Sequence, residues 1–174
     1  MQILYDNLNI SFTIDHTSFS ILNIALERLS KPIPSHSHGE NCYEVHYVSR
    51  GAGLLKTDSR IYDIGPGTLY LTGPNILHEQ TSLPSDPMIE YSVYFHMNCP
   101  SERTVFFTPL KNTPFWICQD SENIPLLFKT LFEELQRKNE GYLPLAASLL
   151  QLFVCTLVRK CTNIILPPPQ KNPT

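Results

Sequence analysis

Three of the six histidines of this chain lie close together in the sequence, beside a carboxylate. The segment His36-Ser37-His38 is followed by Glu44 and His46. Side chains alternate between the two faces of an extended strand, so His36 and His38 can converge on one point, and Glu44 and His46 share a face in the same way. Imidazole nitrogens and a carboxylate oxygen suit a first-row divalent metal ion at ~2.0–2.2 Å.

His78 completes the predicted metal group. It follows the segment between Gly67 and Gly73, so a neighbouring strand can bring it towards the other histidines. The predicted metal ligands are His36, His38, Glu44 and His78. A plain alternative stays open, because two histidines at this spacing also arise by chance and strand histidines are often exposed or hydrogen-bonded.

The glycines predict the strands that position these residues. Six of the seven glycines lie between Gly39 and Gly73. They bound short runs of strand-forming residues, namely Tyr43–Ser49, Gly53–Thr57, Arg60–Ile64 and Thr68–Thr72. Asp58-Ser59 fits the two-residue turn of a hairpin. Turn residues that recur about every 8–12 positions between short strands predict a β-sandwich or a small barrel.

Further strands are predicted on both sides of this region. Met88–Met97 alternates strictly, with apolar residues on one face and Glu90, Ser92, Tyr94 and His96 on the other. Other extended segments are expected at Ile10–Ile14 and Phe19–Leu29, and edge pieces at Thr104–Thr108 and Phe115–Cys118.

The hydrophobic period changes to that of helices after residue 120. Asn123–Lys138 has apolar residues at helical spacing, and Ser121 or Asn123 is suited to cap it. A second helix is predicted from about Pro144 to Lys160, and its apolar surface is wide enough to need cover on two sides. We expect an antiparallel homodimer through residues 144–160. The alternative is that the rest of the monomer covers both sides.

The composition indicates a single globular domain that does not bind nucleic acid by itself. The 174 residues are 42% hydrophobic and 17% charged, and 13 Lys and Arg against 16 Asp and Glu give a net charge of −3. Binding to phosphates needs a basic face. The five cysteines form no C-x-x-C pair and are expected to be reduced thiols. The sequence opens without a secretion signal, and its longest apolar stretch, Leu143–Val158, is short for a membrane span. We therefore expect a cytoplasmic protein that does not cross a membrane.

An ordered series of short motifs carries a family resemblance. The motifs are His36-Ser37-His38, Tyr43-Glu44-Val45-His46-Tyr47-Val48, Gly51-Ala52-Gly53, Ile64-Gly65-Pro66-Gly67-Thr68-Leu69-Tyr70-Leu71 and Gly73-Pro74-Asn75-Ile76-Leu77-His78. Together they resemble the cupin-type regulatory domain of AraC-type bacterial transcription regulators, over residues 10–161. The resemblance implies a mainly β fold: a cupin-like barrel (double-stranded β-helix or jelly roll), followed by two helices that support a dimer.

The resemblance also implies that the domain senses a small-molecule effector. The inward polar side chains expected to orient the effector are His36, His38, Glu44, His46, His78, Tyr94 and His96. A barrel of about eight strands has room for one small ligand, and a polar lining of this kind suits a sugar or a small anion. No cofactor is required for this role, and a divalent metal ion is the alternative.

The spacing departs from that of metal-dependent cupin enzymes. Five residues separate His38 from Glu44, whereas such enzymes place the glutamate three or four residues after the H-x-H segment, and Ser82 stands where they have an asparagine. These departures favour a regulator over an enzyme. Two alternatives stay open: a metal-dependent isomerase or oxygenase that uses the four predicted ligands, and a structural dimerisation module whose barrel is packed shut by Tyr and Phe side chains.

The predicted organisation has three parts. Residues 1–120 form the barrel sensor, residues 121–162 form the helical pair, and the proline-rich residues 163–174 form a linker. The resemblance implies a pair of helix-turn-helix motifs beyond the linker, which we expect to be missing from this sequence. The expected partners are therefore the effector and a second copy of the chain, with DNA reached only through the missing part.

Overall fold

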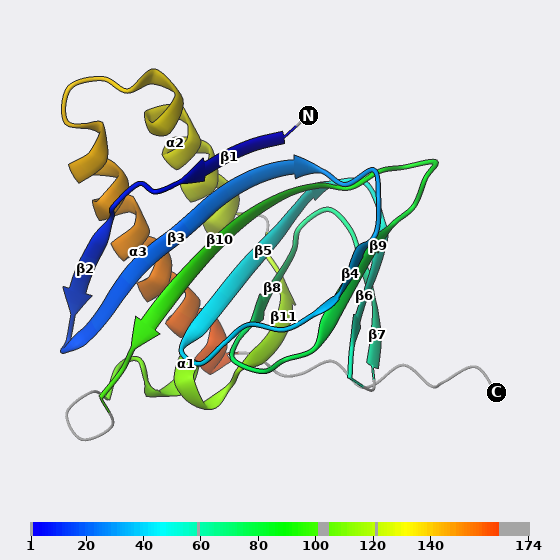
Figure 1. The fold of residues 1–174 in the computed structure, drawn as a ribbon, viewed down its shortest axis with the longest axis horizontal. Helices are drawn as coiled ribbons and strands as arrows, with labels where there is room; N and C mark the ends of the chain where they lie inside the picture. The colour runs from blue at the N-terminus through cyan, green and yellow to red at the C-terminus, as the bar shows by residue number, and fades with distance from the viewer. Residues whose placement is uncertain (1, 59, 101–104, 121, 164–174) are drawn as a thin grey trace.

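The computed structural model describes residues 2–58, 60–100, 105–120 and 122–163. Two antiparallel β-sheets face each other, and helices cover the outer face of the larger sheet (Figure 1). The predicted fold class, a mainly β cupin-type barrel followed by C-terminal helices, is confirmed.

Each sheet is assembled from strands that are far apart in the sequence. The larger sheet contains β1 (Gln2–Asp6), β2 (Ser11–Ile14), β3 (Thr17–Arg28), β5 (Cys42–Arg50), β8 (Thr68–Thr72), β10 (Ile89–Asn98) and β11 (Phe115–Gln119). Its order is β1-β3-β10-β5-β8-β11, and β2 pairs with β3. The smaller sheet contains β4 (Ile33–His36), β6 (Gly53–Thr57), β7 (Arg60–Ile64) and β9 (His78–Ser82), in the order β4-β9-β6-β7.

Two glycines, Gly51 and Gly53, stand where the chain passes from β5 to β6. They are required because other backbone atoms lie very close to them. A Cβ at Gly51, whose φ is +77°, would lie 2.3 Å from the carbonyl oxygen of Pro87. A Cβ at Gly53 would lie 2.3 Å from the carbonyl oxygen of Thr81. Only a residue without a side chain fits such an approach. These two positions let the chain pass from the larger sheet to the smaller one.

The central strands of the larger sheet, β5 and β8, are buried on both faces. On β5, Tyr43, Val45 and Tyr47 belong to the main hydrophobic core, which also contains the inward side chains of the helices. Glu44 and His46, between them, point into the space between the two sheets and contact each other there. The strict alternation of the sequence therefore divides β5 into a helix-facing side and a barrel-facing side.

Part of the space between the sheets is filled by a second, smaller hydrophobic cluster. Its buried members come from both sheets and their connections: Leu29, Val48, Leu55, Ile64, Tyr70, Met88 and Ile117. The polar residues of β4, β5 and β9 lie beside this cluster. The interior is thus divided into an apolar part and a polar part.

The two predicted helices are α2 (Asn123–Arg137) and α3 (Tyr142–Asn163). α3 extends beyond the predicted range at both ends, so residue 163, predicted to begin the linker, is the last residue of the helix. Residues 164–174, the rest of the predicted linker, lie outside the described residues.

Asp120, two residues before the N-cap position Glu122, holds the start of α2, and Glu122 makes no side-chain cap hydrogen bond. Its Oδ1 accepts the backbone N–H of Glu122 at 2.9 Å and that of Asn123 at 3.2 Å. Of the two residues predicted to cap this helix, Asn123 is instead its first residue, and Ser121 lies outside the described residues. Two satisfied N–H groups at a helix start stabilise it by roughly 1 kcal/mol.

Four segments differ from the expectation. Thr108 begins the short helix α1 (Thr108–Asn112), where an edge strand was expected over 104–108, because Pro109 in the first turn favours a helix start. Residue 104 lies outside the described residues. The strands β1, β4 and β9 were not predicted; β1 forms by pairing with β3, and β4 and β9 pair with each other. The edge piece expected at Phe115–Cys118 is present as β11.

α3 is long and apolar enough to cross a membrane by length and composition alone, with a mean hydropathy of 1.5 over an 18-residue window. In this fold it packs against α1, α2 and β2. Its buried residues are Ala146, Leu150, Phe153, Val154, Leu157 and Val158. One third of the apolar window is buried, so much of this helix remains at the surface.

Candidate functional site

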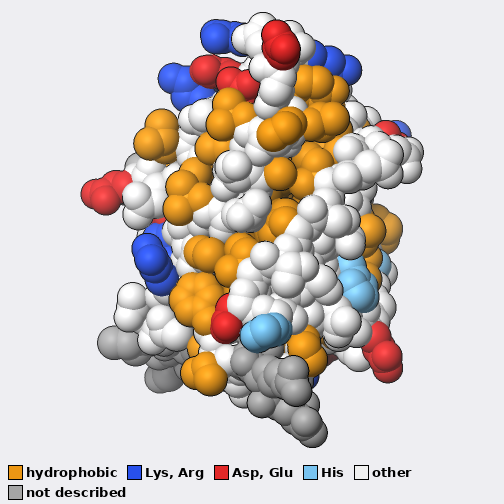
Figure 2. Space-filling model, turned by 90° about the vertical axis from the view of Figure 1, so that its left-hand side faces the viewer, with side chains coloured by type: hydrophobic (Ala, Val, Ile, Leu, Met, Phe, Trp, Pro, Cys, Tyr) orange, Lys and Arg blue, Asp and Glu red, His pale blue; other side chains and the backbone are white. Residues whose placement is uncertain are grey.

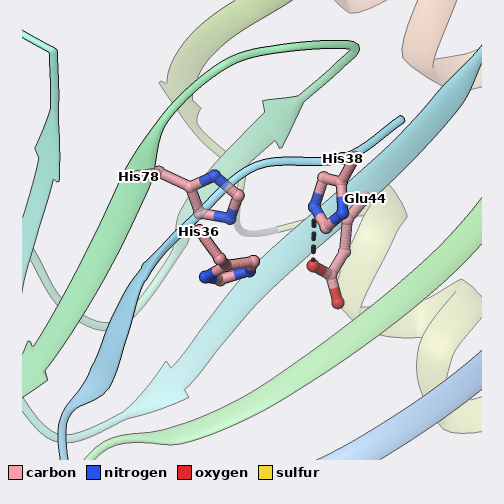
Figure 3. Close-up of side chains that lie close together, drawn as sticks. All are labelled: His36, His38, Glu44 and His78. Carbon is pink, nitrogen blue, oxygen red and sulfur yellow. Dashed lines mark ion pairs between the residues drawn. The ribbon is translucent and has the colours of Figure 1, made fainter. Parts of the chain in front are cut away.

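The four residues predicted as metal ligands come together between the sheets. His36 ends β4 and pairs in register with His78, the first residue of β9. His38 lies in the following loop, which bridges to Pro74, and Glu44 comes from β5. One ligand atom from each residue lies within 4.8 Å of all the others. His36 and His78 lie on one side of the group, His38 and Glu44 on the other (Figure 3).

Backbone carbonyl groups determine which ring nitrogen carries the hydrogen in two of these histidines. His36 Nδ1 lies 2.9 Å from the carbonyl oxygen of Pro34, and His78 Nδ1 lies 2.9 Å from that of Ile76. A carbonyl oxygen can only accept, so each Nδ1 carries the hydrogen. In the neutral ring, the lone pair is then on Nε2, as in histidines that bind metal ions through Nε2. Burial lowers the pKa of His78 to about 4, so its ring is neutral near pH 7.

Two Nε2 atoms of the group, those of His38 and His78, are buried without a hydrogen-bond partner, and so is that of the neighbouring His46. The Nε2 atoms of His38 and His46 lie 3.1 and 3.2 Å from Glu44 Oε2, close enough for ion pairs but without hydrogen-bond geometry. Buried polar atoms without partners cost free energy, and they are rare in folded proteins. Their convergence here indicates a place built for a ligand.

The charges of Glu44 and His46 depend on each other. Burial alone would raise the pKa of Glu44, but His46 and His38 overcome this effect and hold that pKa well below its ordinary value. Burial alone would lower the pKa of His46, but Glu44 and Glu90 outweigh it and raise that pKa to about 10. At neutral pH the site therefore holds a carboxylate beside an imidazolium.

A second layer of polar residues lies deeper in the barrel. His46 Nδ1 donates to Glu90 Oε1 at 2.8 Å. Gln80 Nε2 donates to Glu90 Oε2 at 2.6 Å, and the hydroxyl of Tyr70 donates to the same oxygen at 3.4 Å. The ring of Tyr70 stacks on that of His46, with centroids 4.6 Å apart. Both carboxylate oxygens of Glu90 thus have hydrogen-bond partners.

Sequence reasoning missed three members of this layer: Tyr70, Gln80 and Glu90. The signal for Glu90 was present, since the alternation of Met88–Met97 placed it on the same face as Tyr94. Tyr70 stands in one of the motifs that carry the family resemblance, but that motif implied no chemical role for it, and Gln80 stands in none of these motifs.

Tyr94 and His96 differ in their relation to the site. The ring of Tyr94 lies 4.8 Å from that of His38. Burial, with a hydrogen bond to Cys42, raises the pKa of Tyr94 to about 12, so its hydroxyl is neutral. His96 is two residues further along β10, opposite Cys42 in register. Within the described residues, the ring contacts that join the other site histidines and Tyr94 do not include His96.

The group of His36, His38, Glu44 and His78 fits a divalent metal ion. Three imidazoles and one carboxylate are a donor set that Zn²⁺, Fe²⁺, Mn²⁺ and Ni²⁺ accept. Bonds of ~2.1 Å in tetrahedral geometry place ligand atoms roughly 3.4 Å apart, so side-chain movements of about 1 Å would close the group around an ion. The Nε2 atoms of His38 and His78, neither of which has a hydrogen-bond partner, would each gain a bond to the ion.

Comparison with known proteins gives the family of the chain. No curated protein matches it significantly. Similar solved structures include YhaK from Escherichia coli, with a TM-score of 0.49 and 8% identity over 71% of this chain and 52% of that one. AerE from Microcystis aeruginosa has a TM-score of 0.40 and 17% identity over 65% of this chain and 47% of that one. KdgF from Halomonas sp. has a TM-score of 0.36 and 16% identity over 46% of this chain and 77% of that one.

This chain therefore spans about half the length of YhaK and of AerE. The profile of the AraC-like ligand binding domain matches residues 23–154, which include both sheets' site residues and most of the helical pair. The chain belongs to the family of AraC-like ligand-binding domains.

Proposed function

We propose that this domain senses a small effector inside its barrel, and that a divalent metal ion held by His36, His38, Glu44 and His78 forms part of the binding site. Family membership supports a ligand-binding role. The observation that carries the proposal is the convergence of buried Nε2 atoms without hydrogen-bond partners beside an ionised Glu44. Such a group is costly in the absence of a ligand and becomes favourable when one binds.

The effector class that fits depends on whether the metal ion is bound. Glu44 and Glu90 both face the interior, and His46 is the cation between them. Without the ion, the two buried carboxylates repel a small anion, and a neutral ligand with several hydroxyl groups, such as a sugar, fits better. With the ion bound, its two positive charges offset the carboxylates, and a small anion can bind the ion directly.

Isothermal titration calorimetry tests the metal site. Chelator-treated protein is titrated with Zn²⁺, Ni²⁺ and Mn²⁺, and we expect one ion per chain for at least one metal. His38→Gln and His78→Gln should each lower the affinity by about tenfold or more. His16→Gln, a change at an exposed histidine of the β2–β3 turn, is the matched control. Full affinity in both site variants would overturn the site, and His96→Gln shows whether that residue contributes.

We further propose that α3 forms the dimer. Leu145 is 46% exposed and Leu152 is 52% exposed, although both are large apolar side chains. The side of the molecule that carries α2, α3, β1 and β2 shows hydrophobic side chains gathered along its length (Figure 2). An apolar helix face of this kind is stabilised by a second copy packed against it.

Sedimentation velocity tests the dimer. The wild type is expected to be dimeric at tens of micromolar, and Leu152→Glu to be monomeric at the same concentration. Leu54→Glu is the control, because Leu54 is 39% exposed on the smaller sheet, away from α3. A monomeric wild type would remove the proposal.

Within a regulator, this domain would pass the state of its barrel to a DNA-binding domain in the cytoplasm. The net charge of −3 agrees with a domain that does not itself contact DNA. A mobility-shift assay with this domain alone should therefore show no retardation of DNA. Retardation at physiological salt would contradict this part of the proposal.

A metal-dependent enzyme is the second function that the same four ligands would suit. A metal ion with free coordination positions can activate a bound substrate. The two functions are separated by incubating metal-loaded protein with an effector that binds it and recovering the effector. A sensor returns the effector unchanged by mass spectrometry, whereas an enzyme converts it.

A further inference from the structure

Glu90 is the most deeply placed carboxylate of the barrel, and it does not belong to the metal group. It is 5% exposed and lies on β10. In register, Glu90 is opposite Val48 and Ser92 is opposite His46, so Glu90 and His46 are diagonal neighbours on the barrel side of the sheet. This position lets Glu90 reach His46 from behind, on the side of the ring away from Glu44.

Hydrogen bonds hold the carboxylate of Glu90 in one orientation. Oε1 accepts from His46 Nδ1, and Oε2 accepts from Gln80 Nε2 and from the hydroxyl of Tyr70. Two donors at Oε2 and the ring of His46 at Oε1 hold the carboxyl group in one rotational position. Glu90 is therefore a fixed hydrogen-bond partner of Nδ1 of His46.

His46 is held between two carboxylates. Its Nδ1 is 2.8 Å from Glu90 Oε1 and its Nε2 is 3.2 Å from Glu44 Oε2. The ring also stacks on Tyr70, at an interplanar angle of 9°. The bond to Glu90 thus decides which edge of the ring faces Glu44. Without it, the ring loses the acceptor that keeps its Nε2 edge directed at that carboxylate.

We propose that Glu90 is a positioning residue for the metal site: through His46 it fixes the carboxylate of Glu44 in the place from which Glu44 binds the ion. This inference rests on the proposed metal site. Neighbours that orient a metal ligand without touching the ion change metal affinity by about 10–100-fold in other proteins. Glu90 orients Glu44 in this indirect way, because the ring of His46 lies between the two carboxylates.

Cobalt binding provides the test, because Co²⁺ bound to protein absorbs visible light in a way that depends on its ligands. Chelator-treated wild type, Glu90→Gln and Glu79→Gln are titrated with CoCl₂. Glu90→Gln keeps the size of the side chain but removes its charge, and it places an N–H group where an acceptor was needed. Glu79→Gln is the matched control, on the half-exposed side of β9.

We expect the dissociation constant of Glu90→Gln to rise about 10–100-fold, with a shifted absorption spectrum, and that of Glu79→Gln to stay within about twofold of the wild type. If the wild type binds no Co²⁺, both the metal site and this inference fall. If the wild type binds Co²⁺ and Glu90→Gln matches it in affinity and spectrum, the inference is overturned while the site stands.

Weaker binding with an unchanged spectrum would also overturn the positioning role, because it would indicate a general loss of packing. If Glu90→Gln does not fold by circular dichroism, Gln80→Leu serves in its place. That variant removes one donor to Glu90 and leaves the bond to His46. It should raise the dissociation constant and shift the spectrum in the same direction by a smaller amount, and wild-type behaviour would contradict the inference.

Discussion

Tyr47 of β5 and Tyr91 of β10 lie directly opposite each other, and both rings pack against Phe128 of α2. On the other face of the same two strands, His46 and Glu90 share a hydrogen bond. The polar site and the anchor of the helical layer are therefore back to back on two neighbouring strands. A change in the site that moves either strand would also act on α2.

Replacement of Phe128 by alanine is expected to destabilise the domain strongly. The side chain is 1% exposed and also contacts Phe153 of α3, so its loss leaves a cavity between the sheet and both helices. We expect a loss of about 3–5 kcal/mol in the free energy of unfolding, measured by urea denaturation. Lys129→Ala, at the next, exposed position of α2, should change it by less than about 0.5 kcal/mol. Equal effects of the two changes would contradict this packing.

Gly51→Ala tests the close approach of the chain beside the barrel. The added Cβ would meet the carbonyl oxygen of Pro87, and the positive φ is unfavourable for alanine. Strain of this kind costs about 1–3 kcal/mol, so the thermal midpoint should fall clearly. Gly39→Ala is the control, because a Cβ at Gly39 meets no atom within 4 Å. An unchanged midpoint for Gly51→Ala would show that the turn differs from the one described.

The ion pair between Asp120 and Lys160 should make stability depend on pH in the acid range. Asp120 Oδ2 lies 2.6 Å from Lys160 Nζ, which ties the start of α2 to the end of α3. Burial alone would raise the pKa of Asp120, but Lys160 and the N–H of Glu122 overcome it and lower that pKa below its ordinary 3.8. The folded state then binds fewer protons than the unfolded state near pH 4, so its stability rises with pH there.

This contribution is complete above about pH 5 and is lost as the pH falls through the folded-state pKa of Asp120. Asp120→Asn keeps an oxygen that can cap α2 but removes the ion pair. We expect it to lose about 1–2 kcal/mol at pH 7 and to show a weaker loss of stability between pH 5 and pH 2. Urea denaturation across this range is the measurement, with the exposed Asp86→Asn as control. Parallel pH profiles for wild type and Asp120→Asn would exclude this role.

The strands and helices could be predicted where local pattern and environment agree. The alternation in Met88–Met97 and the glycines around residues 51–73 predicted β6, β7, β8 and β10, because β6, β8 and β10 are buried on at least one face and β7 pairs with β6. The strand β1 escaped prediction because its partner β3, rather than its own residues, determines its conformation. The cap of α2 was missed because Asp120 stands before the residue where the helical period begins.

The site could be predicted only in part, for a physical reason. Alternation showed which side chains share a face within one strand: Glu44 with His46, and Tyr94 with Glu90. It did not show which residues of one strand contact those of another. Glu90 was placed on the correct face, yet its contact with His46 depends on the diagonal register of β5 and β10. The same limit applies to His96, which shares the face of Tyr94 but lies further along the strand.

Anomalous X-ray scattering from metal-soaked crystals shows directly whether the barrel binds a metal ion. Data collected on either side of the zinc absorption edge locate any bound Zn²⁺ independently of the protein atoms. We expect one ion per chain at ~2.0–2.2 Å from nitrogens of His36, His38 and His78 and from an oxygen of Glu44. Fully soaked crystals with no anomalous peak between the sheets, or with a peak bound only by surface residues, would contradict the proposed metal site.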